Sequence, residues 1–409
     1  MSRLFVKILN KVHISNRQTL FELCFLMALG LFPIIWTQGR LLAGFDIPIF
    51  PNMREYLSHS FFLWDDRLYL GNPSASIGLI FPVQVPWAIF ESIGISMANR
   101  TTIMLCAMFA ATGMGMYYFI SVMDPTRQQL SRLAAAVFYM FNLFSLQFFS
   151  WQQYSLIMAY IVLPVCLGLY KAAYEQHRYR NLAVIAILSL FITPQYTPSF
   201  ILFWGVIFAY TCYVLVLGPG SRIFIVKFFV FSGLLAIAVS VPFLIALSSL
   251  TVVPITAWAE RSKASVDFYM SQASTINIFR LMGFYTWGQE NVVPHYSFGE
   301  IYFQSPIMIF LTFLVPLGVF GAMLIDKRPP KDIKFFLWYL PLSLLLTTGP
   351  SGPFGQRFYE WIHNTIPGFT SIFGQATTKI PLLTTLSYAV LLAYLISQAT
   401  KCLAKGKSH

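Results

Sequence analysis

The sequence predicts an all-α polytopic membrane protein built as one domain over residues 1–409, and three observations lead to that prediction. The chain is 57% hydrophobic and only 10% charged, and its mean hydropathy is +0.66. Apolar runs recur along it, and several approach the ~20 residues that a helix needs to cross a bilayer. Lysine and arginine gather in every second connection between these runs, as the positive-inside rule expects.

Ten apolar segments define the predicted bundle, so we expect about ten transmembrane helices, within a range of ten to twelve. Residues 1–19 precede the first segment; they are polar and basic, and we assign them to the cytoplasmic N-terminus. Two of the segments are short, and a tilted, broken or re-entrant helix would each fit them. The ten segments lie at about 20–38, 101–122, 132–149, 155–173, 181–194, 199–218, 223–249, 306–325, 335–348 and 381–398.

The distribution of charge predicts the orientation. With ten crossings, 18 of the 27 Lys and Arg residues fall on the side of the N-terminus, and every short loop on that side is basic. Ten of the 15 acidic residues fall on the other side. We therefore expect a multi-pass plasma-membrane protein with both termini inside and its polar chemistry outside. The net charge of +12 is then a topogenic signal, and we expect no nucleic-acid partner.

Three long external segments carry the polar residues: 39–100, 250–305 and 349–380. The first includes the stretch 83–95, which is too short and interrupted to span the membrane, so we expect a helix lying in the plane of the interface. Long loops in compact proteins are usually functional or disordered, and the aromatic content of these three favours ordered, functional loops.

An ATP-driven pump, a soluble-type hydrolase and an ion-coupled transporter are disfavoured by the sequence. The chain has no P-loop, no HExxH and no GxSxG motif, and its six histidines and five cysteines show no metal-ligand spacing. Few charged residues lie in the middle of the apolar segments, where ion-coupled transporters usually keep some. We expect the polar residues Asn142 and Gln147, which do lie there, to bridge helices.

Candidate site residues follow from the external segments. Asp46 lies a few residues past the first apolar segment, where a carboxylate at the lipid boundary suits a general base; the alternative is a cap on the turn before Pro48. Cations for a lipid phosphate are Arg261, Lys263, Arg280 and Lys379, although Lys379 also fits a snorkelling anchor. Candidates for stacking on a sugar ring, or for the interfacial belt, are Trp64, Trp287 and His295.

Three stretches support a family resemblance. The segment FDIPIFPNMREYLSHSFFLWDDRLYLGNPSASIGLIFP resembles the first external loop of AftD-like arabinofuranosyltransferases, in the GT-C glycosyltransferase superfamily. The paired apolar runs over 139–173, and FGQATTKIPLL at 373–383, resemble the same family and, more distantly, YfhO-like proteins. In FGQATTKIPLL the family lysine matches Lys379, whereas Gly374 and Thr377 depart from the pattern. In the first loop the matching positions are Asp46, Trp64, Asp65, Gly71, Asn72, Phe81 and Pro82.

The resemblance implies a GT-C-like helical bundle and an inverting glycosyl transfer on the external face. The donor would be a polyprenyl-phosphate-linked sugar and the acceptor a cell-envelope glycan or glycolipid, with Asp46 as the general base. Asp65 and Asp66 would orient the acceptor or hold a divalent cation such as Mg²⁺ or Mn²⁺. The alternative is a non-catalytic flippase, transporter or assembly subunit for a lipid-linked saccharide.

Overall fold

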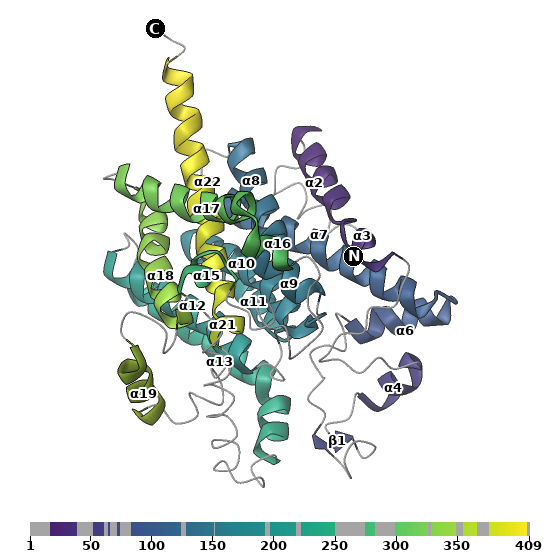
Figure 1. The fold of residues 1–409 in the computed structure, drawn as a ribbon. Helices are drawn as coiled ribbons and strands as arrows, with labels where there is room; N and C mark the ends of the chain where they lie inside the picture. The colour runs from purple at the N-terminus through teal and green to yellow at the C-terminus, as the bar shows by residue number, and fades with distance from the viewer. Residues whose placement is uncertain are drawn as a thin grey trace.

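A computed structural model gives the fold of the chain, and its described part is helical apart from one short strand pair (Figure 1). The described residues are 17–38, 52–60, 64–65, 72–73, 83–123, 128–150, 152–192, 197–217, 222–249, 275–282, 299–325, 329–348, 355–365 and 376–406. The strands β1 (Trp64–Asp65) and β2 (Asn72–Pro73) pair antiparallel.

Each of the ten apolar segments coincides with one helix or with two consecutive helices. These helices are α2 (Arg17–Leu29), α3 (Pro33–Thr37), α7 (Met97–Met123), α8 (Gln129–Phe141), α9 (Leu143–Ser150), α10 (Tyr154–Glu175), α11 (Arg180–Ser189), α12 (Thr197–Leu217), α13 (Arg222–Ser249), α17 (Pro306–Ile325), α18 (Lys331–Thr348) and α22 (Pro381–Gly406). Shorter helices lie between them: α4 (Met53–Ser60), α6 (Val85–Ser92), α15 (Thr275–Phe279), α16 (Gly299–Gln304), α19 (Gly355–Thr365) and α21 (Ala376–Lys379).

The chain is an α-helical membrane protein. Among the described residues, five helical stretches are long and apolar enough to cross a bilayer, and α8 with α9, bent by 45°, makes a sixth if the pair is one span. The count of ten crossings and the inside position of both termini remain predictions. The five stretches are Gln18–Ile35, Met97–Met123, Tyr154–Glu175, Ser199–Leu217 and Pro381–Leu403.

The core forms where α7, α8, α10, α18 and α22 pack on one another, and α22 runs through the middle of the bundle (Figure 1). Helices α7 and α10 approach closely because Gly115 has no side chain: a Cβ there would come within 3.1 Å of the Ile161 carbonyl oxygen. In contrast, α2 is peripheral and exposes Leu20, Phe21 and Phe25, as expected of a lipid-facing helix.

One end of the bundle, which we call the inner end, is closed by polar ties between helices. Arg132 of α8 pairs with Glu22 of α2 at 3.1 Å, and the Tyr117 hydroxyl of α7 donates to the same carboxylate. Across the bundle, Lys171 of α10 pairs with Asp332 of α18 at 2.7 Å. Figure 1 shows the start of α2, the start of α8 and the end of α22 together at the top of the view. The opposite end is the outer end.

Asn142 explains why the predicted segment 132–149 is two helices rather than one. Its amide nitrogen donates to the carbonyl oxygens of Phe138 and Tyr139, both at 3.0 Å, which completes the end of α8. Its amide oxygen accepts the Ser145 N–H at 3.0 Å, which caps the start of α9. The same amide reaches the Tyr160 hydroxyl of α10 at 2.8 Å, so the prediction that Asn142 bridges helices is confirmed.

Candidate functional site

The first external segment begins, in its described part, with a fully capped helix, α4. The Asn52 side-chain oxygen accepts the Glu55 N–H at 3.2 Å, and the Asn52 amide donates to the Glu55 carboxylate at 2.9 Å. This pairing resembles a capping box, and it explains why a helix of only eight residues starts at Met53.

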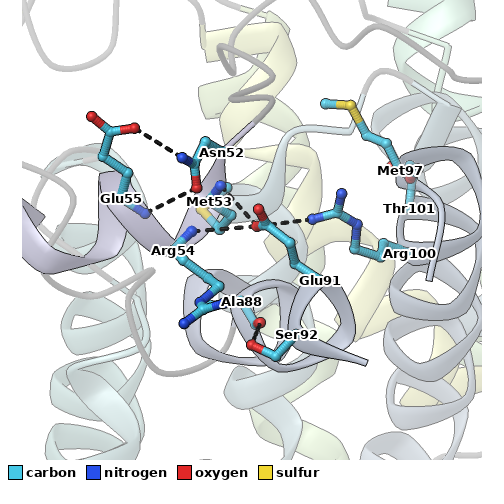
Figure 2. A network of polar contacts seen from close by, with 10 residues as sticks. All are labelled: Asn52, Met53, Arg54, Glu55, Ala88, Glu91, Ser92, Met97, Arg100 and Thr101. Carbon is cyan, nitrogen blue, oxygen red and sulfur yellow. Dashed lines mark hydrogen bonds and ion pairs between the residues drawn. The ribbon is translucent and has the colours of Figure 1, made fainter. Parts of the chain in front are cut away.

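Glu91 of α6 fixes this helix to the bundle (Figure 2). One oxygen of its carboxylate, Oε2, accepts the backbone N–H of Met53 at 2.9 Å and that of Arg54 at 3.3 Å. The same oxygen receives Nη1 of Arg100, in the first turn of α7, at 3.1 Å. Arg100 is 8% exposed, so the pair is largely withdrawn from water. The outer ends of α6 and α7 therefore hold α4 in one position.

The strand pair of the first external segment contacts a second helix, α13. Trp64 pairs with Pro73 and Asp65 with Asn72, and β2 lies against α13. Because α13 leads into the second external segment, the backbone that carries Trp64 and Asp65 lies next to the helix preceding Arg261, Lys263 and Arg280. The strand pair of the first external segment therefore lies beside α13, the helix that precedes the second external segment.

Arg280 is the predicted phosphate ligand whose side chain the structure describes most fully. It follows the short helix α15 and is 5% exposed, beside the buried Ile278 and Leu281. Its Nε donates to the Thr312 hydroxyl of α17 at 2.8 Å, and its Nη2 donates to the Tyr302 carbonyl oxygen of α16.

Within the described part of the chain, the printed contacts of the Arg280 guanidinium are to neutral groups. Nη1 donates to the Asn277 side-chain oxygen at 3.3 Å, and the group lies 5.6 Å from the centre of the Phe313 ring. The acceptors described for it are thus a hydroxyl, an amide and a carbonyl oxygen, without a carboxylate. Burial lowers the pKa of Arg280, but the guanidinium keeps its charge because its ordinary pKa is above 12.

Lys379 lies at a different depth from Arg280. Lys379 is half-buried and ends α21, just before α22. The residue of α22 that contacts the neighbourhood of Arg280 is Tyr388, whose hydroxyl donates to the carbonyl oxygen of Phe279 at 3.3 Å. Lys379 and Tyr388 are nine residues apart, which corresponds to about 13 Å along a helix. The described contacts therefore do not bring Arg280 and Lys379 together, and phosphate binding by either cation remains a prediction.

The other predicted site residues fall mostly outside the described part of the chain. Of Trp64 and Asp65 the structure describes the backbone alone, within β1. In the part of the chain that the structure describes, no three His, Cys, Asp or Glu side chains gather to hold a metal ion, and a cation at Asp65 and Asp66 remains a prediction. The residues outside the description are Asp46, Asp66, Arg261, Lys263, Trp287 and His295.

Two features of the outer end were not predicted from the sequence. One is the ion pair between Glu91 and Arg100, whose spacing of nine residues carries no helical signal because a turn separates them. The other is a pair of buried polar groups on α6: Gln84 is 6% exposed and Trp87 is 3% exposed. The Gln84 Oε1 and the Trp87 Nε1 have no hydrogen-bond partner within the described structure. Trp87 packs edge-on against Tyr154 of α10, with the ring centres 6.0 Å apart.

Comparison of the chain with protein-family models and with curated proteins gave no match. The fold and the described contacts define the class as an α-helical membrane protein.

Proposed function

We propose that the protein is a membrane glycosyltransferase that transfers a sugar from a polyprenyl-phosphate donor to a cell-envelope glycan or glycolipid on the external face. The observation that carries the proposal is Arg280, a buried cation whose described hydrogen-bond acceptors are all neutral. Burying a charge without a counter-charge is costly, and a phosphate would supply that counter-charge. The described residues accept three of the five guanidinium N–H groups, and we propose that a phosphate accepts the other two.

The depth of Arg280 supports a phosphate attached to a lipid. Its partner Thr312 is six residues past the start of α17, or about 9 Å along that helix. On the same helix Ile307, Phe310 and Leu311 are exposed, as expected for residues facing acyl chains. A phosphate carried on a polyprenyl chain can approach this level from within the bilayer, whereas a soluble phosphate cannot do so easily.

In the proposed reaction, the Asp46 carboxylate takes the proton of an acceptor hydroxyl as its oxygen attacks the anomeric carbon of the donor. The new glycosidic bond forms while the bond from that carbon to the phosphate oxygen breaks, so the configuration inverts. Polyprenyl phosphate leaves with the electron pair, and Arg280 stabilises its negative charge. Lys379 would meet the donor nearer the surface, and Asp65 and Asp66 would orient the acceptor.

The inner end supports an enzyme over a flippase or transporter. A carrier must open to both sides, whereas buried ion pairs tie the helices at the inner end, between Glu22 and Arg132 and between Lys171 and Asp332. Breaking such a buried pair costs about 3–5 kcal/mol. An enzyme whose substrate enters and leaves at the outer end does not need to break these ion pairs.

The first test measures lipid binding to the protein in nanodiscs, with undecaprenyl phosphate and the neutral alcohol undecaprenol as probes. We expect the phosphate to bind more tightly, and Arg280→Gln to weaken its binding roughly 10- to 100-fold while leaving the alcohol unchanged. The matched control is Arg180→Gln, an exposed arginine at the start of α11, which should change neither affinity. Equal binding of both probes to the wild-type protein would overturn the proposal.

The second arm measures sugar transfer from polyprenyl-phosphate sugars. Asp46→Asn should keep the phosphate binding and lose roughly 10²- to 10⁴-fold in transfer rate, as expected for the loss of a general base. Unchanged transfer would refute the role of Asp46. Phosphate-selective binding without transfer of any donor sugar would instead identify a non-catalytic carrier or assembly subunit.

A further inference from the structure

Helix α19, Gly355–Thr365, is amphipathic and lies in the third predicted external segment. At 100° per residue, its aromatic and aliphatic residues fall on one side, and Arg357, Glu360 and Asn364 fall on the other. Trp361 and Arg357 are four residues apart and are neighbours at the boundary between the two faces. A tryptophan and an arginine at that boundary are typical of a helix lying at a membrane surface.

The apolar face of α19 is divided between protein and surroundings. Ile362, near its centre, is buried at 8% exposure, whereas Trp361 is 59% exposed and Phe358 is 36% exposed. The Phe358 and Trp361 rings stack, with centres 6.0 Å apart and an angle of 25° between their planes. The stacked pair thus forms an exposed aromatic edge beside the buried Ile362 on the same apolar face.

The position of α19 limits what can cover this edge. Only six residues separate it from the end of α18 at Thr348, so its start lies within about 25 Å of that end. Ten residues separate it from α21, which leads directly into the membrane-crossing stretch of α22. Figure 1 shows α19 to the side of the bundle, below α18, and not among the core helices. On α18 itself, Trp338 and Leu342 are exposed, which fits the prediction that this helix lies in the membrane.

We propose that α19 lies in the headgroup layer of the outer leaflet, with the Phe358 and Trp361 rings toward the acyl chains and the Arg357 guanidinium at the lipid phosphates. The aromatic edge is then continuous with the lipid-facing surface of α18, and Glu360 and Asn364 face water. The occupant is the lipid surface, because α19 lies between α18, a predicted membrane segment, and α21, which leads into the membrane-crossing stretch of α22. The aromatic rings would contact the acyl chains, and the neighbouring positive charge would contact the anionic headgroups above them.

The test attaches nitroxide spin labels at single cysteines in the full chain, reconstituted in nanodiscs of phosphatidylglycerol and phosphatidylethanolamine, after replacement of the five native cysteines. Labels go at Phe358→Cys and Trp361→Cys on the aromatic edge, and at Asn364→Cys, an exposed position on the polar face, as the matched control. Accessibility to oxygen, which concentrates in lipid, is compared with accessibility to a water-soluble nickel complex.

We expect oxygen to dominate at positions 358 and 361 and the nickel complex to dominate at 364, with calculated depths of about 5–10 Å for the first two. Nickel access at all three positions would show that α19 stands in water and would overturn the proposal. Low access to both reagents at 358 and 361 would show that protein covers the edge, and would overturn it equally. Neither result depends on glycosyl transfer, so the proposal stands or falls separately from the proposed function.

Discussion

At the scale of single residues, Glu91 holds the first external segment in place, because one carboxylate oxygen serves two backbone N–H groups of α4 and the Arg100 guanidinium. Glu91→Ala leaves all three donors without that partner and leaves Arg100 charged and largely buried. We expect a loss of roughly 3 kcal/mol in stability. Hydrogen exchange should show the Met53 and Arg54 amides exchanging faster, while amides in the middle of α7 keep their protection.

The control for Glu91 is a double variant. Replacing Arg100 as well, in Glu91→Ala with Arg100→Met, removes the uncompensated charge and should restore part of the stability, though not the protection of the α4 amides. If Glu91→Ala alone leaves those amides as protected as in the wild-type protein, α4 is held by other contacts and Glu91 is not its anchor.

The sequence predicted a residue's role well where the chemistry of that residue alone determines the role. It predicted the role poorly where the role depends on contacts with residues distant in the sequence. Asn142 was expected to bridge helices because a buried amide in an apolar segment needs partners, and the structure confirms this. The role of Glu91 was not predicted, because its partners are 9 and 38 residues away in the sequence. The roles of the predicted site residues remain predictions, because Asp46, Asp66, Arg261 and Lys263 lie outside the described residues and only the backbone of Asp65 is described.

At the scale of elements, Asn142 sets the 45° bend between α8 and α9 because one side chain completes both helices. Asn142→Ala removes the cap of α9 and the bond to the Tyr160 hydroxyl, and should cost about 2–3 kcal/mol. Asn142→Asp keeps the acceptor for the Ser145 N–H but turns a carboxylate toward two carbonyl oxygens, so we expect it to cost more. Thermal unfolding in detergent measures both.

Asn99→Ala is the matched control for this bend, since Asn99 is an exposed asparagine of α7 and its loss should change stability by less than about 0.5 kcal/mol. An Asn142→Ala protein as stable as this control would mean that the bend is set by packing around α8 and α9 and not by the amide.

Periodicity and length predicted the helices themselves, because each apolar segment can make all its backbone hydrogen bonds within a helix. They did not predict α15, whose five residues are too few to show a period. Contacts from α16, α17 and α22 to Phe279 and Arg280 hold the end of this helix. The stretch 83–95 was expected to be an interfacial helix, and α6 forms there with Ile89 and Ile93 exposed and Trp87 buried. Its position relative to the membrane remains a prediction.

At the scale of the whole molecule, the two ends of the bundle differ in character. The inner end carries the buried pair of Glu22 with Arg132 and the partly buried pair of Lys171 with Asp332, and the Tyr210 hydroxyl also donates to Asp332 at 2.8 Å. The outer end carries the capped α4, the strand pair and Arg280. A closed inner end and an elaborated outer end are the arrangement expected of an enzyme that works on one side of a membrane.

This arrangement predicts which turns face which side. Asn99, in the first turn of α7, and Gln176, just after α10, are both exposed, and three crossings separate them if α8 and α9 form one span. In intact cells, a membrane-impermeant maleimide should therefore label Asn99→Cys, and should label Gln176→Cys only after the membrane is opened. The parent protein, with its five cysteines, gives the background.

Labelling of both positions from outside would mean that α8 and α9 turn back without crossing, which would remove one of the predicted crossings. Labelling of Gln176→Cys alone would reverse the orientation and place Arg280 and α4 on the cytoplasmic side, where an external glycosyl acceptor could not reach them.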